Sequence, residues 1–345
     1  MFRKRYTLCS ALLELTLQCN MRCTHCGSSA GNRRENELST DEWMNVCRQL
    51  SELNCGQVIF TGGEPILRND WYEIAQCVRD SGMNFSILSN GLMINEDTVN
   101  HLRKLNPHAV AISIDGAKPE THDAIRRVPG SFHKCMEALN LLQAKSVPAS
   151  VVTTTHKMNF KELPQIREFL LNKGIAWQIQ IGNPMGRFPK DLALSHEEFY
   201  AVAMFIASTR KQYSYKEMPI TGAHCIGYHS SILPNATLSP WIGCHAGINV
   251  ISIQSNGGIK GCLSLPDDFI EGNIKENQLA DMWNNPDAFL YNRKFTIEDL
   301  NNDCRECRYG KSCKGGCLSQ STSTTGKMHG DPYCLHLIEK KMVVK

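Results

Sequence analysis

Short apolar runs alternate with longer amphipathic stretches between residues 11 and 211. A short apolar or β-branched run predicts a buried strand, whereas apolar residues spaced three or four apart predict a helix. The apolar runs predict strands at 11–17, 57–61, 85–88, 109–114, 149–155 and 176–181. The spaced residues predict helices at 40–53, 70–80, 96–105, 131–143, 160–172 and 195–211.

Six strand–helix units imply an α/β fold with a parallel sheet covered by helices, either open or closed as a barrel. Right-handed crossovers place the carboxyl ends of such strands on one rim, where α/β barrels carry their functional residues. A cysteine-rich loop follows the first predicted strand, and polar turns follow the next three at Gly62–Pro65, Ser89–Gly91 and Asp115–Gly116. The sequence therefore predicts a functional site on this rim. Ser39-Thr40-Asp41-Glu42 also resembles a capping box, which would start the first helix.

The character of the chain changes at about residue 215. Prolines and glycines interrupt any long periodicity from there on, at Pro219, Gly222, Gly227, Pro234 and Pro240. We therefore divide the chain into residues 1–214 and 215–345, and expect the second part to be loop-rich. Such a domain is expected to be held together by metal rather than by a large core.

Composition narrows the class of protein. The 345 residues include 42% hydrophobic and 21% charged residues, as in a globular domain, and the formal net charge of +3 is too small to indicate a nucleic-acid partner. No run of about 18 apolar residues indicates a membrane helix. Leu8–Leu13 is not followed by a signal-peptide cleavage site, so a cytoplasmic location is predicted. The 16 cysteines then favour metal sites over disulfides, which are rare in a reducing compartment.

Three of these cysteines, Cys19, Cys23 and Cys26, lie in a Cys-x3-Cys-x2-Cys pattern directly after the first predicted strand. Three thiolates on one loop can hold three irons of a cubic iron–sulfur cluster and leave the fourth iron free for another ligand. Zinc is the alternative, but structural zinc sites usually take four ligands from two Cys-x2-Cys knuckles.

With these three cysteines the chain resembles the radical S-adenosylmethionine (SAM) enzymes. The resemblance implies a partial (β/α)6 barrel and a [4Fe–4S] cluster whose fourth iron binds SAM. It also implies that an electron from the cluster cleaves SAM to a 5′-deoxyadenosyl radical, which abstracts a hydrogen atom from the substrate. The protein then supplies placement and electrostatics for chemistry that belongs to the cofactor.

The resemblance also implies which residues contact SAM. Gly62-Gly63-Glu64 resembles the family motif that meets the SAM amino group, and glycine allows a close backbone approach. Ser113 and Arg126 lie where peptide-modifying members use a serine and an arginine, and a guanidinium suits a carboxylate. Ser89-Asn90 is a candidate for the ribose, and His25 occupies the position of a ring that packs near adenine. Taken singly, Gly62–Pro65 and Ser89–Gly91 are also ordinary turns.

Seven further cysteines near the carboxyl terminus resemble the pattern of the SPASM domain, an extension found in many radical SAM enzymes that act on peptides. The resemblance implies two auxiliary iron–sulfur clusters. One would be held by Cys304, Cys307, Cys313 and Cys334. The other would be held by Cys244, Cys262 and Cys317.

The second set is one ligand short. Cys225, nineteen positions before Cys244, is the first candidate for the fourth ligand, and a buried structural thiol is the alternative role for it. His224 and His245 are two further candidates, and an open iron that meets the substrate is another possibility.

Family members with this architecture act mostly on peptides, so a ribosomally made precursor peptide is the predicted substrate. Thioether or carbon–carbon crosslinking, epimerisation and backbone splicing are the reactions implied. Cys26–Gly31 resembles the spliceases, which excise a tyramine unit. The sulfatase-maturating branch carries an aspartate after the cysteine that corresponds to Cys262, and this chain has Leu263 instead. Asp267 and Asp268 are out of register and are expected to be loop acids.

Two partner proteins are expected. One is a separate leader-peptide-binding protein, because only 18 residues precede Cys19. The other is a flavodoxin- or ferredoxin-type reductant. Two other functions remain open. The chain could be a radical enzyme that acts on a small molecule, or an iron–sulfur electron-transfer protein. An electron carrier would not need Gly62–Glu64 or Arg126.

Overall fold

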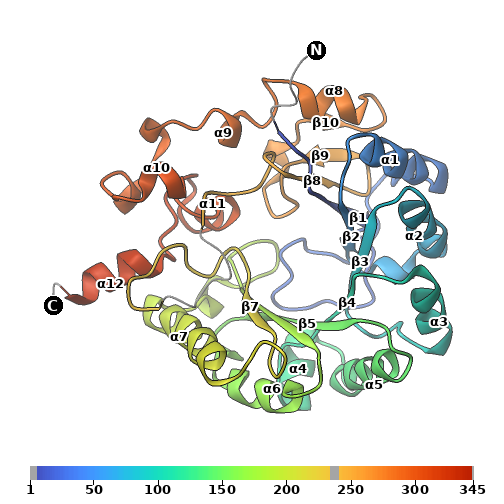
Figure 1. The fold of residues 1–345 in the computed structure, drawn as a ribbon, viewed down its shortest axis with the longest axis horizontal. Helices are drawn as coiled ribbons and strands as arrows, with labels where there is room; N and C mark the ends of the chain where they lie inside the picture. Colours follow the sequence, from blue (N-terminus) through green and yellow to red (C-terminus); the bar gives the residue numbers. More distant parts are fainter. Residues whose placement is uncertain (1–5, 234–240, 344–345) are drawn as a thin grey trace.

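The computed structural model describes residues 6–233 and 241–343. Its centre is a single sheet of ten strands in the order β10-β9-β8-β1-β2-β3-β4-β5-β6-β7, parallel from β8 to β7 (Figure 1). The strands are β1 (Ser10–Thr16), β2 (Gln57–Gly62), β3 (Asn84–Ser89), β4 (Ala109–Ser113), β5 (Ala149–Thr155), β6 (Ala176–Ile181), β7 (Ile220–Gly222), β8 (Val250–Ile253), β9 (Gly258–Lys260) and β10 (Gly272–Asn273).

Six helices cover the outer face of the curved sheet (Figure 1). They are α1 (Thr40–Glu52), α2 (Trp71–Asp80), α3 (Glu96–Leu105), α5 (Ser131–Ala144), α6 (Leu163–Leu170) and α7 (His196–Gln212). A further helix, α4 (Pro119–Arg126), lies beside the loop after β1, where Thr24 N donates to Ile125 O. The prediction of six strand–helix units in an α/β sheet is confirmed. The capping box is also confirmed, because Ser39 Oγ accepts from Glu42 N and the Glu42 carboxylate accepts from Ser39 N.

Two local predictions need correction. Residues 160–172 are not one helix, because a 3-10 turn at Phe160–Glu162 precedes α6, which has a proline in its first turn. Proline has no backbone N–H to donate and fits this position, so the helix begins there. α4 was not predicted from the sequence, and it also has a proline, Pro119, in its first turn.

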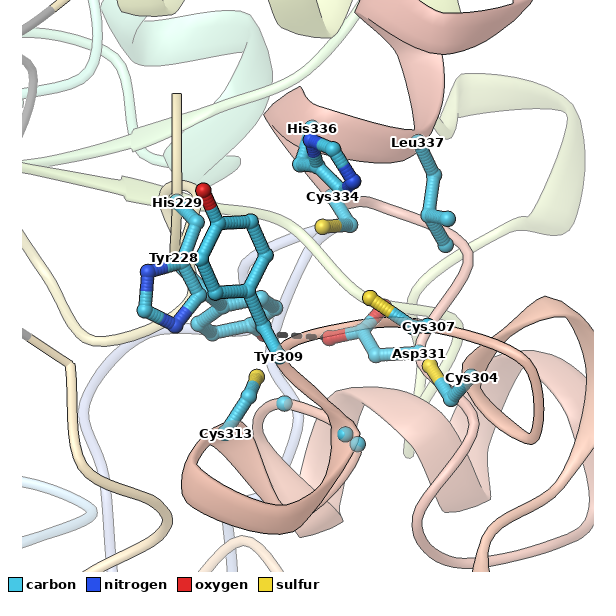
Figure 2. A pocket seen from close by; sticks show the side chains of 13 residues that line it. Tyr228, His229, Cys304, Cys307, Tyr309, Cys313, Asp331, Cys334, His336 and Leu337 are labelled. Carbon is cyan, nitrogen blue, oxygen red and sulfur yellow. Dashed lines mark hydrogen bonds between the residues drawn. The ribbon is translucent and has the colours of Figure 1, made fainter. Parts of the chain in front are cut away.

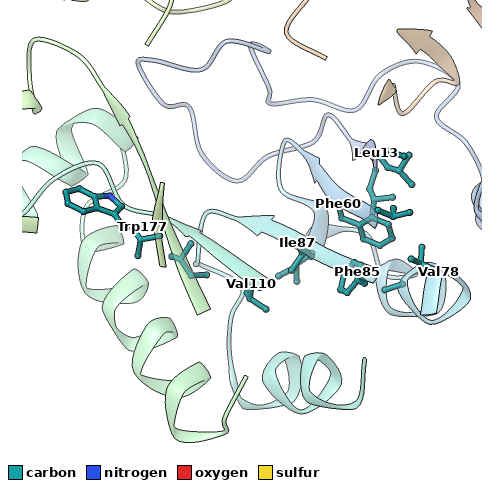
Figure 3. Packing of buried hydrophobic residues seen from close by; sticks show 14 of the residues in the cluster. Leu13, Phe60, Val78, Phe85, Ile87, Val110 and Trp177 are labelled. Atoms are coloured by element: carbon teal, nitrogen blue, oxygen red, sulfur yellow. The ribbon is translucent and has the colours of Figure 1, made fainter. Parts of the chain in front are cut away.

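Apolar side chains from neighbouring strands form one continuous core between sheet and helices (Figure 3). The Phe60 and Phe85 rings, on β2 and β3, meet edge to face with their centroids 4.9 Å apart. Val78 of α2 and Val110 of β4 belong to the same core. Alternate strand residues therefore supply the packing, while the strand ends remain available for polar groups.

The second part of the chain joins this core, contrary to the expectation that metal rather than a large core would hold it. β8 pairs in parallel with β1, and Ile251, Ile253, Trp283 and Phe289 are buried in the same apolar cluster as the strands of the first part. Residues 250–273 therefore extend the sheet, and the segment up to residue 293 packs on the same core. The boundary between residues 214 and 215 stays a prediction.

Five helices follow β10: α8 (Leu279–Asn284), α9 (Leu290–Arg293), α10 (Gly310–Cys313), α11 (Leu318–Thr325) and α12 (Leu335–Val343). The last three lie along the open side of the sheet, between its two edges (Figure 1). α12 is anchored to α7, because the Tyr200 hydroxyl donates to the Glu339 carboxylate over 3.2 Å. None of the helices in the described parts of the chain is both long and apolar enough to cross a lipid bilayer.

Candidate active site and auxiliary thiol sites

The cysteine loop leaves the carboxyl end of β1 and returns to it. Cys19 N donates to Gly31 O and Gly31 N donates to Leu17 O, each over 3.0 Å, so these two bonds close the loop at its base. The Glu37 carboxylate accepts from Thr16 Oγ1 and Leu17 N and fixes the point where the chain leaves the strand. The thiols of the loop are therefore held over the middle of the sheet.

Each thiol in the loop has an N–H donor beside it. Met21 N lies 3.4 Å from Cys19 Sγ, Ala30 N lies 3.4 Å from Cys26 Sγ, and Arg126 Nη1 lies 3.8 Å from Cys23 Sγ. Burial raises the pKa of Cys19 and Cys23, so these thiols need a cation to deprotonate them. Three soft ligands with N–H donors around them fit the ligand set of an iron–sulfur cluster.

The glycines of the Gly-Gly-Glu turn are required by packing against this loop. A Cβ at Gly62, where φ is +137°, would lie 2.2 Å from Thr16 O, and a Cβ at Gly63 would lie 2.1 Å from Gln18 O. Only glycine permits this approach of two backbones. The turn after β2 is thereby fixed to the residues that lead into Cys19.

Glu64 is fully buried beside the loop. Its Oε1 accepts from Ser89 Oγ over 3.0 Å, and its Oε2 accepts from Asn90 N over 2.7 Å. Burial raises the pKa of Glu64 to about 7, although these hydrogen bonds oppose the shift. Asn90 Nδ2 donates to Asn20 Oδ1 over 2.7 Å. Ser89 and Asn90 therefore serve the carboxylate and the cysteine loop, and their contact with a ribose stays a prediction.

Asp115, which was not among the site residues predicted from the sequence, joins two of the predicted cofactor contacts. Its Oδ2 lies 2.6 Å from Arg126 Nη2 and 3.1 Å from His25 Nε2, and its Oδ1 accepts from Thr154 N over 2.8 Å. Burial would raise its pKa, but Arg126 and then His25 hold the pKa of Asp115 far below its usual range. Ser113 ends β4 two residues earlier and is partly buried.

His156 is a second residue that the sequence did not indicate. It follows β5, is fully buried, and its ring centroid lies 5.6 Å from that of His25. Burial lowers the pKa of His156 to about 4, so the ring is neutral near pH 7. Met158 N donates to its Nδ1 over 3.3 Å, which leaves the proton on Nε2, and no residue in the described parts of the chain accepts from that atom.

The four thiols assigned to one auxiliary cluster line a single pocket. Figure 2 shows the sulfur atoms of Cys304, Cys307, Cys313 and Cys334 around it. Burial, and after it the nearby thiols of Cys334 and Cys307, raise the pKa of Cys304 to about 12. Ligands that repel one another as anions in this way fit a cationic cluster of iron.

The remaining auxiliary cysteines also lie together, and Cys225 is among them. Burial raises the pKa of Cys317 well above its usual range, and the nearby thiols of Cys244 and Cys225 raise it further. Burial is the main cause that raises the pKa of Cys244, and the nearby Cys262 thiol also raises it. Cys225 Sγ accepts from Ile181 N over 3.4 Å at the end of β6. The arrangement supports Cys225 as a fourth ligand, which stays a proposal.

The two histidine alternatives lie against each other and against Trp241. The His224 and His245 ring centroids are 4.7 Å apart, and the Trp241 ring is stacked 6.2 Å from that of His245. Asp267 is an exposed loop acid, as expected, and is paired with the buried Lys260 over 3.0 Å. That ion pair occupies its carboxylate.

Comparison with known proteins agrees with this geometry. Residues 13–170 match the family model of the Radical SAM superfamily, and residues 244–308 match that of the SPASM iron–sulfur cluster-binding domain. The chain is 28% identical to the AdoMet-dependent heme synthase of Methanosarcina barkeri, over 95% of this chain and 96% of that protein. It is 29% identical to the mycofactocin maturase MftC of Mycobacterium tuberculosis, over 93% of this chain and 81% of that protein.

A similar fold occurs in SuiB of Streptococcus suis bound to S-adenosylmethionine, with a TM-score of 0.77. The two chains are 17% identical, and the match covers 95% of this chain and 77% of SuiB. The two domains imply a [4Fe–4S] cluster with SAM and auxiliary iron–sulfur clusters. The predicted fold class and cofactors are thus confirmed.

SAM affinity should fall in acid because of Glu64. The protonated carboxyl binds the SAM ammonium poorly, so affinity at pH 6 should be about tenfold weaker than at pH 8, as for one group that titrates near pH 7. Equilibrium dialysis of the cluster-loaded protein would measure this dependence. Glu64→Gln should flatten it, and an equal slope in both proteins would contradict the assignment.

Asp115→Asn should weaken SAM binding, because it releases Arg126 and His25 and leaves a buried guanidinium without its counter-charge. Loss of one partner of a buried pair costs about 3–5 kcal/mol, so the melting temperature should also fall. Asp80→Asn, at an exposed end of α2, is the control and should change neither value. Wild-type SAM affinity in Asp115→Asn would exclude the positioning role.

Cys225→Ala should lower the iron content and change the absorption spectrum of the reconstituted protein. Cys55→Ala is a matched control, because burial raises the pKa of both thiols to about 11 and Cys55 lies outside every predicted cluster. Unchanged iron and spectra in Cys225→Ala would assign Cys225 to packing alone.

Proposed function

This chain is a radical SAM enzyme with a SPASM domain, and on that premise we propose that it modifies a ribosomally made precursor peptide. The main support for a peptide substrate is the similarity to the mycofactocin maturase over 93% of the chain. In this proposal the peptide enters on the side of the sheet where α11 and the loop after β6 meet. Ser319 Oγ, on α11, lies 3.6 Å from Met185 Sδ at that point.

When bound, the cluster and SAM supply the electron and the 5′-deoxyadenosyl radical that removes a substrate hydrogen. The residues of the chain orient this cofactor. Glu64 would accept from the SAM ammonium, because Oε1 already accepts from Ser89 and Ile66 but Oε2 keeps a lone pair beyond the one used by Asn90. Arg126 would donate to the SAM carboxylate from its Nε, which has no hydrogen-bond partner among the described residues.

Asp115 would hold both Arg126 and His25 in place as SAM binds. Although burial works against its charge, Asp115 raises the pKa of Arg126 above its ordinary value, so the guanidinium stays charged. His25 keeps its Nε2 on the carboxylate and presents the ring face and Nδ1 to the adenine side. The three residues act as one preorganised unit.

The cue for splicing comes from Cys26–Gly31, and packing of the loop explains much of that segment. Ala30 N donates to Cys26 Sγ, and a Cβ at Gly31 would lie 2.6 Å from Arg22 Cζ. These residues shape the thiol loop, so they say little about the bond that changes. Splicing, crosslinking and epimerisation are therefore separated by the mass of the product in the test below.

Modification of a tetrapyrrole is the second candidate function. It is favoured by the match to 96% of the length of the AdoMet-dependent heme synthase. Sulfatase maturation has less support, since Leu263 stands at the position of the expected base and Asp267 is paired with Lys260. An iron–sulfur protein that only transfers electrons would not need Glu64 and Arg126, because it would not bind SAM.

Anaerobic incubation of the reconstituted protein with SAM and dithionite should yield 5′-deoxyadenosine, and Glu64→Ala should lower the yield by about tenfold or more. The substrate is a precursor peptide encoded beside this reading frame, with or without a candidate leader-binding protein. Splicing lowers the mass by C8H9NO, which is the tyrosine residue without its carbonyl and two hydrogens less than free tyramine. Crosslinking removes two hydrogens, and epimerisation leaves the mass unchanged.

The same assay with an iron porphyrin tests the second candidate through its absorption spectrum. No deoxyadenosine with verified clusters would overturn the radical function. Deoxyadenosine with an unmodified peptide and an altered porphyrin would overturn the peptide substrate. Tight binding of the precursor by this chain alone would count against a separate leader-binding protein.

A further inference from the structure

Three rings from separate segments lie against one another at the four-thiol pocket. The His229 and Tyr309 rings are stacked, with centroids 4.2 Å apart and planes at 9°, and the Tyr309 and His336 rings meet at 4.9 Å (Figure 2). All three rings are partly exposed and line the same pocket as the thiols. Cys304, Cys313 and Cys334 are buried beneath. The rings therefore connect the thiol pocket with the surface.

The surface around these rings is cationic. Residues 305–314 carry four basic side chains and one acidic one, a net charge of +3 that equals the formal net charge of the whole chain. Arg305, Arg308 and Lys311 are exposed. The Arg308 guanidinium lies 4.7 Å from the centre of the Tyr309 ring, and its Nη2 donates to the Tyr309 hydroxyl.

The neighbouring helix α12 adds to this charge. Lys340 and Lys341 lie in its last turn and are exposed, and Lys340 and Arg308 both act on the pKa of His336, after burial. Lys341 is paired with Asp303 over 2.7 Å, and this ion pair neutralises its charge. Of the two lysines, Lys340 therefore adds to the positive charge of the face. Glu306 is the one acidic side chain between Arg305 and Lys311.

A cationic face on an otherwise nearly neutral chain favours encounter with an acidic protein, through steering and correct orientation. The stacked rings lie at the thiol pocket, so a partner that docks on them would exchange electrons with a cluster held there. This is a second requirement for the partner. A radical SAM enzyme consumes one electron for each SAM that it cleaves reductively. A one-electron carrier meets both requirements.

We propose that the face formed by Arg305, Arg308, Tyr309, Lys311 and Lys340 is the docking site of an acidic one-electron carrier protein of the flavodoxin type. The proposal rests on the radical function proposed above. The carrier loses one electron and its hydroquinone becomes a semiquinone. With one SAM, that electron yields methionine and the 5′-deoxyadenosyl radical, which becomes 5′-deoxyadenosine when it takes the substrate hydrogen.

The test is binding of the cluster-loaded enzyme to an immobilised acidic flavodoxin at low and high salt. The affinity should fall steeply with salt, because charges at the rim of an interface are screened. The double variant Arg308→Glu/Lys311→Glu should bind at least about tenfold more weakly and lose most of the salt dependence. Arg103→Glu/Lys104→Glu makes the same charge change on α3, on the other side of the molecule, and should bind like the wild type (Figure 1).

A second measurement separates docking from chemistry. With reduced flavodoxin as donor, Arg308→Glu/Lys311→Glu should form 5′-deoxyadenosine at least about tenfold more slowly. With dithionite it should keep the wild-type yield, so loss under both donors would indicate failure of the radical function or of the fold. Equal flavodoxin affinity in all three proteins would overturn the proposal. A loss of affinity for the precursor peptide alone would overturn it as well and assign the face to the peptide.

Discussion

The position of β1 in the middle of the sheet is the constraint on which the rest of the site depends. β1 pairs with β2 on one side and with β8 on the other, so its carboxyl end is fixed from both sides. Glu14, buried in β1, accepts from Arg34 over 2.6 Å and from Ser255 Oγ over 3.0 Å. One carboxylate thus joins the strand, the segment after the cysteine loop and the second part of the chain.

Burial of anionic groups around that strand end prepares the site for cations. Burial raises the pKa of Cys19, Cys23 and Glu64, so these groups are favoured in their neutral forms before iron and the SAM ammonium arrive. Arg126 and Asp115 differ, because each is the counter-charge of the other at 2.6 Å. The Arg126–Asp115 pair is therefore charged before the cofactor binds, whereas Cys19, Cys23 and Glu64 become anionic when iron and the SAM ammonium bind.

The sequence was sufficient for the elements whose signal is local. The apolar runs predicted six strands, and Ser39 and Glu42 predicted the start of α1. The pairing of β8 with β1 depends on residues some 240 positions apart in the chain, as Ser10 and Val250 show, and no periodicity carries that information. Asp115 was visible at the end of a strand, yet its importance comes from two partners that only the fold brings to it.

The two halves of the second part of the chain differ in how much apolar core they have, and therefore in how much they need metal. Residues 250–293 share the main core with the sheet, through Ile251, Ile253 and Phe289 among others. The segment with the four-thiol pocket has a small core of its own, in which Cys304, Cys313 and Cys334 lie among Tyr228, Trp241, Leu300 and Leu337. So few apolar side chains contribute little burial energy, and thiols replace hydrocarbon at the centre of the cluster. The dependence on iron for folding is therefore expected to be confined to this segment, while the sheet extension is stable through its apolar contacts.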